Sequence, residues 1–381
     1  MNIEKFELEW WLNPYDAIAT YNMGSSCCKP MNMQELFELE GVSQDEVMDQ
    51  IAHMSLHYGY FEGMPRLKDA IANLFETSQV EAQNVMVVHG ATSANAITCY
   101  ALCEKGDNVI VVVPSYQQFV SIPKALGCEV RPYVSGPEDG FGINFRKLAD
   151  MVDGHTKAIL LTSPSNPTGY GMSRKELEQL AAIARPVGAY VVCDEIYRGL
   201  TKDYAASIVD VYERGISTGG TSKVFSSAGL RIGWIVSRDL GLTHVVKNLR
   251  SFNTICESPI TELLAAIILE HKDEIFARNL KICEEGRVAL NEWLKDQPHF
   301  HLACESKGST SFLTYDWDIP TKEFCEDLFD KTGALVCHGM CFNMEYGFRI
   351  GYGYGDVEYF KAGLAKLAEY AASLPDELLR A

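Results

Sequence analysis

"AILLTSPSNPTGYGMSRKELEQLAAIARPVGAYVVCDE" occupies residues 158–195 and decides the fold class. The runs at 158–162 and 190–195 are apolar and rich in β-branched residues, which is typical of strands buried on both faces of a sheet. Residues 173–188 predict a helix, because Ser173 and Glu176 form a capping-box pattern and Gly188 marks its end. A strand, a helix and a second strand in this order indicate an α/β sheet.

The same alternation extends over residues 85–236. Further apolar, β-branched runs predict strands at 85–89, 109–113, 129–134 and 232–236, with helical patterns between the strands. We therefore predict an α/β doubly wound sheet that is covered by helices.

The pattern changes after about residue 255. A long helical pattern at 258–296 is followed by a strand pattern around 309–316 and a second helical pattern at 321–333. The first forty or so residues are too few to fold alone, and we expect them to pack on this second region. The predicted domains are a large α/β domain at 48–255 and a small α+β domain formed by 1–47 and 256–381.

The composition is that of a globular protein. The chain has 381 residues, which suggests about two domains, and 47% of them are hydrophobic while 22% are charged. The 33 Lys and Arg residues against 51 Asp and Glu residues give a net charge of −18, which disfavours nucleic acid and anionic membrane partners. The start "MNIEKFELEWW" does not resemble a signal peptide, and no apolar run approaches a membrane span of about 18 residues, so we expect a cytoplasmic protein.

The twelve cysteines are scattered through the chain and are expected to be reduced core thiols. Cys99 with Cys103, and Cys337 with Cys341, are four residues apart. Neither pair is matched by a second pair at zinc-site spacing, although His338 is close to one of them, so we predict no metal site.

A candidate reactive lysine stands in "TSKVFSSAGLRIGW" at 221–234. A lysine in a desolvated pocket loses its proton readily and forms Schiff bases, which suits Lys223. Arg231, eight residues later, offers a fork of donors that fits a phosphate. The alternative is a surface lysine and an arginine in an ordinary salt bridge.

Polar residues follow the predicted strands at the edge where open α/β sheets bind ligands. Asn166 follows the strand at 158–162, and Asp194 ends the strand at 190–195 with Tyr197 three residues later. An N-cap role is the alternative for Asp194. The backbone N–H groups of 90–92, in "VVHGATSANAI", offer a phosphate cradle at a helix start.

Seven motifs together resemble the class I/II aminotransferases of the fold-type-I pyridoxal-phosphate enzymes. In order they are "YGYFEG" (58–63), "HGATSA" (89–94), "PSYQQF" (114–119), "SPSNPTG" (163–169), "CDEIY" (193–197), "TSK…GLRIGW" (221–234) and "FRIG" (348–351). The resemblance covers about residues 50–355. It implies a large domain with a mainly parallel seven-stranded sheet plus a smaller α+β domain, pyridoxal 5′-phosphate as cofactor, amino acid and 2-oxo acid substrates, and a homodimer.

The resemblance also assigns catalytic roles. Lys223 resembles the lysine that forms the internal aldimine and carries a proton between the substrate Cα and the cofactor. Asp194 resembles the partner of the pyridine nitrogen, which keeps the ring an electron sink. Asn166 and Tyr197 resemble the donors to the phenolic oxygen, and Asn166 also borders the substrate.

The remaining assignments concern the ring, the phosphate and the substrate. Tyr116 is similar to the aromatic residue that stacks on the ring, and Arg349 to the arginine that grips the substrate α-carboxylate. Tyr58 resembles the tyrosine that reaches the phosphate of the neighbouring subunit. The implied phosphate cup consists of Ala91, Thr92, Ser222 and Arg231.

Two departures from the family pattern concern the phosphate contacts and the substrate. Gly220 stands where the family commonly has a hydroxyl residue, so one phosphate contact is lost or moved to Thr221. The segment "YNMGSSCCKP" at 21–30 replaces the usual N-terminal segment over the substrate, and with "LEWW" at 8–11 it is similar to the capreomycidine-synthase-like branch, which handles arginine-derived substrates.

Three functions are considered for a chain with these residues. The first is an aminotransferase, and the second is a lyase, cyclase or oxidase that acts on an arginine-like amino acid. In the second case, an extended segment would point Glu7 and Glu9 the same way, toward a cationic side chain; the alternative is that both are solvated charges. The third function, a cofactor-sensing regulator, is disfavoured because no DNA-binding module or basic stretch precedes residue 50.

Overall fold

The computed structural model describes residues 2–201 and 205–380. Its helices and strands are, in chain order, α1 (Glu7–Tyr15), β1 (Tyr21–Asn22), α2 (Met33–Phe37), α3 (Gln44–Ala52), α4 (Pro65–Ala72), β2 (Val85–His89), α5 (Gly90–Leu102), β3 (Asn108–Val113), α6 (Gln118–Leu126), β4 (Glu129–Val134), α7 (Phe145–Ala149), β5 (Thr156–Thr162), α8 (Arg174–Ala184), β6 (Tyr190–Asp194), α9 (Ile208–Val211), β7 (Gly215–Gly220), β8 (Ile232–Ser237), α10 (Leu240–Ser251), α11 (Pro259–Glu270), α12 (Lys272–Leu294), β9 (Phe300–Leu302), β10 (Thr310–Tyr315), α13 (Thr321–Thr332), β11 (Ala334–Leu335), β12 (Cys337–His338), β13 (Gly347–Gly351) and α14 (Val357–Ala372).

The largest sheet has seven strands in the order β2-β8-β7-β6-β5-β3-β4. Only β8 runs antiparallel to its neighbours, and the strands from β7 to β4 pair in parallel. The predicted α/β class and the mainly parallel seven-stranded sheet are confirmed, and all six strand patterns lie in this sheet.

Strand β7 was not predicted, because "GISTGG" lacks a β-branched apolar run. Its glycines are explained by close packing: a Cβ at Gly215 would lie 2.8 Å from the oxygen of Ile208, and a Cβ at Gly219 would lie 2.7 Å from Nε1 of Trp234. A Cβ at Gly220 would lie 2.8 Å from the oxygen of Ile232. Every residue of this strand is buried.

Alternate side chains of the central strands build two cores. In β5, Ala158 and Leu160 pack on one face, where α5, α6 and α10 contribute, while Ile159 and Leu161 face the core shared with α4, α8 and α11. Burial of each such large aliphatic side chain stabilises the fold by about 1.5–3 kcal/mol. Both faces of the sheet are thus covered, as the continuous apolar runs predict.

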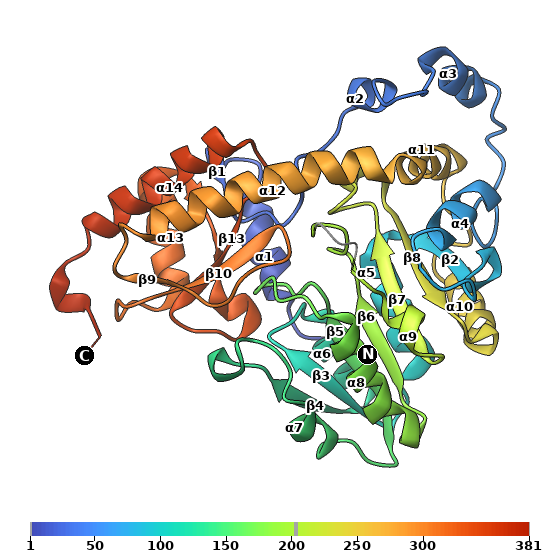
Figure 1. Ribbon diagram of the computed structural model, residues 1–381, viewed down its shortest axis with the longest axis horizontal. Helices are drawn as coiled ribbons and strands as arrows, with labels where there is room; N and C mark the ends of the chain where they lie inside the picture. The colour runs from blue at the N-terminus through green and yellow to red at the C-terminus, as the bar shows by residue number, and fades with distance from the viewer. Residues whose placement is uncertain (1, 202–204, 381) are drawn as a thin grey trace.

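A smaller antiparallel sheet has the order β12-β13-β10-β9, and α13 and α14 accompany it (Figure 1). The predicted helical pattern at 258–296 forms two helices, because the chain leaves helical geometry at His271 (φ −102°, ψ 24°). The second of them, α12, runs from α11 to α14 across the molecule (Figure 1). The division at 47/48 and 255/256 stays a prediction.

The N-terminal segment packs on the small sheet region, as expected, since β1 pairs in parallel with β11. The expectation of an extended stretch around Glu7 and Glu9 is wrong, because residues 7–15 are helical. Leu8 and Trp11, three residues apart, are buried on one face of α1, and Nε1 of Trp11 donates to the oxygen of Val336 at 2.9 Å. Glu7 and Glu9 therefore point in different directions.

The twelve cysteines are free thiols, and nine are buried while Cys27, Cys256 and Cys304 are half-buried. Over residues 2–201 and 205–380, no cluster of three or more His, Cys, Asp or Glu side chains is arranged to hold a metal. Within the same ranges no helix has the length and apolar character needed to cross a membrane.

Candidate active site

The site lies at one edge of the seven-stranded sheet. Strands β2, β5, β6 and β7 end at this edge, and the antiparallel β8 begins there, so the loops that follow or precede these strands converge. A cavity of about 630 Å³ opens at this edge, bounded also by α1 and β13. Ten of the eleven predicted site residues line it: Ala91, Thr92, Tyr116, Asn166, Asp194, Tyr197, Ser222, Lys223, Arg231 and Arg349.

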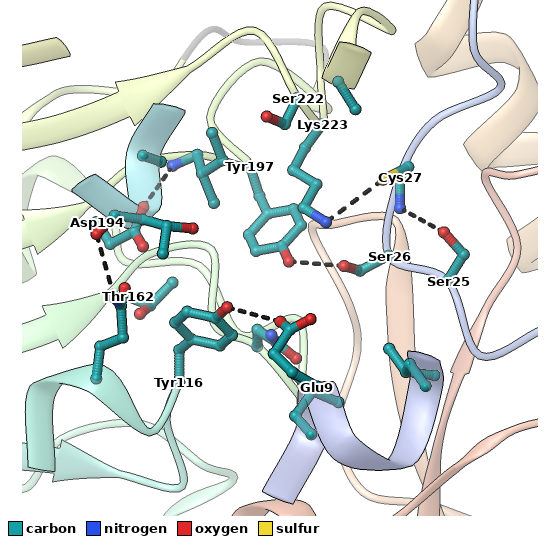
Figure 2. A pocket seen from close by; sticks show the side chains of 18 of the residues that line it. Glu9, Ser25, Ser26, Cys27, Tyr116, Thr162, Asp194, Tyr197, Ser222 and Lys223 are labelled. Carbon is teal, nitrogen blue, oxygen red and sulfur yellow. Dashed lines mark hydrogen bonds between the residues drawn. The ribbon is translucent and has the colours of Figure 1, made fainter. Parts of the chain in front are cut away.

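Lys223 follows β7 and points into the cavity, where its Nζ donates to Sγ of Cys27 at 3.4 Å (Figure 2). Burial lowers the pKa of this lysine, but its electrostatic interactions with Cys27 and Tyr197 outweigh burial and leave the pKa above its ordinary value. Lys223 is thus a half-buried cavity group and not a surface lysine.

Asp194 is buried at the end of β6. Its carboxylate accepts from Nδ2 of Asn95 at 2.8 Å and from the backbone N–H of Ile196 at 3.1 Å. No helix follows at 195–200, so the N-cap alternative does not hold. Burial raises the pKa of Asp194 to about 6 although these two donors lower it. A carboxylate held this way is suited to pair with a positively charged nitrogen in the cavity.

Asn95 was not predicted, although it is polar in the interior of helix α5. Its Oδ1 accepts from the Thr218 hydroxyl of β7 at 2.6 Å, so the side chain is fixed with its nitrogen toward Asp194.

The start of α5 and Arg231 form a cradle for an anion. His89 provides no side-chain cap, so the first N–H groups of this helix face the cavity without that partner. Gly90 must be glycine, because its φ is +74° and a Cβ there would lie 2.8 Å from Nη2 of Arg231. Thr221 does not line the cavity, and its hydroxyl bonds to the oxygen of Ser227 at 3.2 Å. Thr221 therefore does not supply at the cavity the hydroxyl that Gly220 lacks.

Arg349 reaches the cavity from β13 and is 1% exposed. Its Nη1 donates to Oδ1 of Asn166 at 2.8 Å, and its Nη2 donates to the oxygen of Gly24 at 2.5 Å. Its Nε is buried without a partner. The guanidinium is therefore fixed by the protein and still has donor capacity for an anionic ligand.

The N-terminal segment supplies the remaining wall (Figure 2). The hydroxyl of Tyr116 donates to Glu9 of α1 at 2.9 Å, and the hydroxyl of Tyr197 donates to Oγ of Ser26 at 2.9 Å. Burial first, and the charge of Glu9 second, raise the pKa of Tyr116. From the sequence, the segment 21–30, which contains Ser26 and Cys27, was expected over the substrate, and Glu9 was a candidate to face it; all three residues line the cavity. Asp16 lines the cavity too but was not predicted, since it belongs to none of the motifs.

Buried polar atoms without partners identify the cavity as a ligand site. Besides Nε of Arg349, the hydroxyl of Thr162 and Oε1 of Gln118 are buried, line the cavity and have no protein partner. Such atoms are costly unless a ligand or water satisfies them. The cavity thus suits a ligand with a phosphate at the α5 cradle, a flat ring between Tyr116 and Asp194, and a carboxylate at Arg349.

Tyr58 is the predicted residue that does not line the cavity. Its side chain is on the surface and 66% exposed. The role that the resemblance implies for it, in a neighbouring subunit, stays a prediction.

Comparisons with known proteins are consistent with a cavity that binds such a ligand. A family model described as aminotransferase class I and II matches residues 35–368. The chain is 28% identical to capreomycidine synthase from Streptomyces vinaceus over 75% of this chain and 74% of that protein. It is also 28% identical to aspartate aminotransferase from Pyrococcus abyssi over 80% of each. The crystal structure of a PLP-dependent aminotransferase from Streptococcus suis superposes with a TM-score of 0.94 at 33% identity, and covers 99% of this chain and 100% of that one.

Proposed function

The chain belongs to the class I and II aminotransferases, a family of enzymes that depend on pyridoxal 5′-phosphate (PLP), and on this premise we propose that it moves an amino group from an L-amino acid to a 2-oxo acid. The observation that carries the proposal is the convergence of Lys223, Asp194 and Arg349 on one cavity. A reactive amine, a buried acid and a fixed guanidinium are the three groups that the reaction requires.

We assign the cofactor to this cavity because its unsatisfied atoms and its cradle fit the group. PLP, once bound, supplies an aldehyde that condenses with amines and a ring that withdraws electrons from the substrate Cα. Arg231, Ser222 and the N–H groups of Ala91 and Thr92 would hold its phosphate. Tyr116 would cover the ring face, while Asn166 and Tyr197 would donate to the phenolic oxygen.

Three side chains perform the chemistry in this proposal. Nζ of Lys223 would hold the cofactor covalently at rest, and as a free amine it would accept the proton of the substrate Cα and give it up again. The carboxylate of Asp194 would pair with the ring nitrogen of the cofactor and favour its protonated form. Arg349 fixes the substrate α-carboxylate and thereby directs the Cα–H bond toward Lys223.

We also propose a cytoplasmic homodimer in which Tyr58 completes the phosphate site of the partner. Exposed apolar side chains on two neighbouring segments support it: Leu56, Tyr58, Tyr60, Phe61, Phe252 and Ile255. The Arg250 guanidinium donates to the oxygens of Phe61 and Ile255, both at 2.5 Å, and so holds the two segments together. An apolar surface of this kind is suited to a second copy of the chain.

A second candidate is a lyase, cyclase or oxidase on an arginine-like amino acid. Among residues 2–201 and 205–380, the cationic residues that line the cavity are Lys223, Arg231 and Arg349, and the proposal commits each of them to the cofactor or the α-carboxylate. Glu9 and Asp16 line it as well, so the charge left for the substrate side chain is negative. The likeness to capreomycidine synthase also favours this candidate.

One experiment tests both candidates. The holoenzyme is mixed with single amino acids, and the cofactor absorbance is followed before and after a 2-oxo acid is added. An aminotransferase converts its cofactor once and recovers the starting spectrum with the 2-oxo acid, whereas a lyase or cyclase consumes the amino acid repeatedly without an acceptor. Borohydride reduction and peptide mapping should place the cofactor on Lys223; a label on another lysine would contradict the assignment.

A further inference from the structure

Asp194 belongs to a row of three side chains that crosses neighbouring strands at the edge of the cavity. Thr162 of β5 is paired with Asp194 of β6, and Asp194 is paired in turn with Thr218 of β7. Residues paired in this way have their side chains on the same face of the sheet. Thr162 and Asp194 both line the cavity (Figure 2). Asn95 of helix α5 contacts the other two residues of the row and so joins Asp194 to Thr218.

The amide of Asn95 lies between an acid and a hydroxyl. Its Nδ2 donates to Oδ2 of Asp194 at 2.8 Å, and its Oδ1 accepts from the hydroxyl of Thr218 at 2.6 Å. Asn95 is 1% exposed and Thr218 is fully buried, so solvent does not compete for either bond. If the amide were turned over, its oxygen would face a carboxylate that has no proton to donate, and the bond from Thr218 would be lost. The hydroxyl of Thr218 therefore keeps the nitrogen of Asn95 toward Asp194.

We propose that Asn95 and Thr218 are positioning residues, which hold the carboxylate of Asp194 in the charged form that pairs with the ring nitrogen of the cofactor. The inference rests on the proposed function, in which Asp194 must be charged to favour a protonated ring. Asn95 supplies a hydrogen bond to the charged acid, and Thr218 keeps the donor in place.

The burial of Asp194 makes such a donor necessary. Asp194 is 4% exposed, and burial raises its pKa to about 6, because a charge is costly away from water. The hydrogen bonds from Asn95 and from the N–H of Ile196 lower the pKa and so oppose burial. Among the residues that the structure describes, these two are the donors to the carboxylate. Without Asn95 one donor remains, and a larger share of Asp194 is protonated near neutral pH.

Other ionisable groups near Asp194 do not take over this role. Besides burial, Glu195 raises the pKa of Asp194, while Lys223 lowers it by less than Asn95 does. Lys223 is also the residue that the proposed function joins to the cofactor. The raised pKa of Tyr116, which burial causes in the first place, keeps its hydroxyl uncharged. Asn95 is therefore the side chain that decides how far Asp194 stays charged.

The first test measures the acid in full-length protein freed of cofactor. Denaturant unfolding of proteins with Asp194 and with Asp194→Asn is compared over a range of pH, once with Asn95 and once with Asn95→Leu. The stability that Asp194 contributes is lost as the pH rises, and this loss ends near the pKa of the folded state. It should end near pH 6 with Asn95 and about one pH unit higher with Asn95→Leu, since a hydrogen bond to a charged group is removed. An unchanged end of the loss overturns the proposal.

Thr98→Val is the matched control for Asn95→Leu. Thr98 belongs to the same helix, is 1% exposed, and its hydroxyl has no hydrogen-bond partner, so the loss should still end near pH 6. An equal shift in Thr98→Val would mean that any change in this helix disturbs Asp194, and would overturn the proposal.

Thr218→Val keeps the β-branched shape and removes only the hydroxyl. It should shift the end of the loss in the same direction as Asn95→Leu but by less. The double variant should match Asn95→Leu alone, because Thr218 acts through Asn95. Shifts that add in full would overturn the role of Thr218. If Asn95→Leu does not fold, Thr218→Val decides, and the absence of any shift in it overturns the proposal.

The second test uses the holoenzyme. Asn95→Leu should lower kcat about tenfold or more at pH 7, move the acid limb of the kcat profile to higher pH and leave KM nearly unchanged. Thr98→Val should keep the wild-type profile. A lower kcat with an unmoved acid limb would show a merely structural role and overturn the proposal. If no amino acid reacts with the wild type, the proposed function fails, while the unfolding comparison still decides whether Asn95 holds Asp194 charged.

Discussion

The Tyr116 hydroxyl donates a 2.9 Å hydrogen bond to the carboxylate of Glu9, and this contact joins helix α1 to the loop after β3. Both residues line the cavity. The aromatic ring proposed to cover the cofactor is therefore positioned by a helix that also bounds the cavity. Because Glu9 keeps a second carboxylate oxygen, it can hold Tyr116 and still present negative charge to a substrate.

Glu9→Gln should reduce activity selectively with cationic amino acids. Glutamine still accepts the Tyr116 hydrogen bond but removes the charge, so kcat/KM for arginine should fall about tenfold or more, as expected for a charge-assisted hydrogen bond of about 1.5–3 kcal/mol. The values for alanine and an aromatic amino acid should change little. Glu7→Gln is the matched control, since Glu7 is exposed and pairs with Lys5. Equal losses on all three substrates would show that Glu9 acts only through Tyr116.

Asp194→Asn should abolish most turnover and yet stabilise the cofactor-free protein above neutral pH. Burial raises the pKa of Asp194 from 3.8 to about 6, so the folded state retains a proton that the unfolded chain has lost. This stability is present below about pH 4 and is lost as the pH rises to about 6. Between about pH 4.5 and 7.5 the wild type should lose about 2 kcal/mol relative to the variant, on a scale of 1.36 kcal/mol per pKa unit.

Denaturant unfolding of both cofactor-free proteins at the two pH values measures this difference. Turnover of the cofactor-loaded variant should fall by a factor of about 10² or more, which is the effect expected when a catalytic group is removed. A variant with near wild-type turnover would mean that Asp194 is structural, and parallel pH dependences would contradict the raised pKa.

Arg349→Lys should raise KM for every substrate and leave cofactor binding intact. The guanidinium is held by Asn166 and Gly24 and keeps a buried, unpartnered Nε. A lysine ammonium cannot reproduce these planar contacts and the bidentate grip on a carboxylate together. An increase in KM of about 10- to 100-fold is expected from a lost charge-assisted pair. Titration of the cofactor absorbance is the control; an unchanged KM across the substrate panel would refute the assignment.

Sequence patterns predicted the parts of this molecule in which one local signal suffices. Apolar runs identified the buried strands, and motifs placed Lys223, Asp194 and Arg349, which the fold does bring together. Strand β7 was not predicted, because its glycines are explained by tight packing against Trp234 and Ile232 of another strand, which a local pattern does not show. The contacts of Glu9 with Tyr116 and of Cys27 with Lys223 join residues 107 and 196 positions apart, so no local pattern could reveal them.

Mixing two inactive variants should restore activity if the proposed dimer shares its sites through Tyr58. Tyr58→Ala removes a group that each site takes from its partner, and Lys223→Ala removes one that each site takes from its own chain. A hybrid dimer then has one site with both groups intact, so an equimolar, randomly exchanged mixture should recover up to about a quarter of wild-type activity. The measurement is turnover at limiting cofactor, after subunit exchange and for each variant alone. Leu56→Asp, on the exposed apolar surface, should prevent the rescue by leaving 42.4 kDa monomers. Dimers that exchange without any gain in activity would place Tyr58 outside the site.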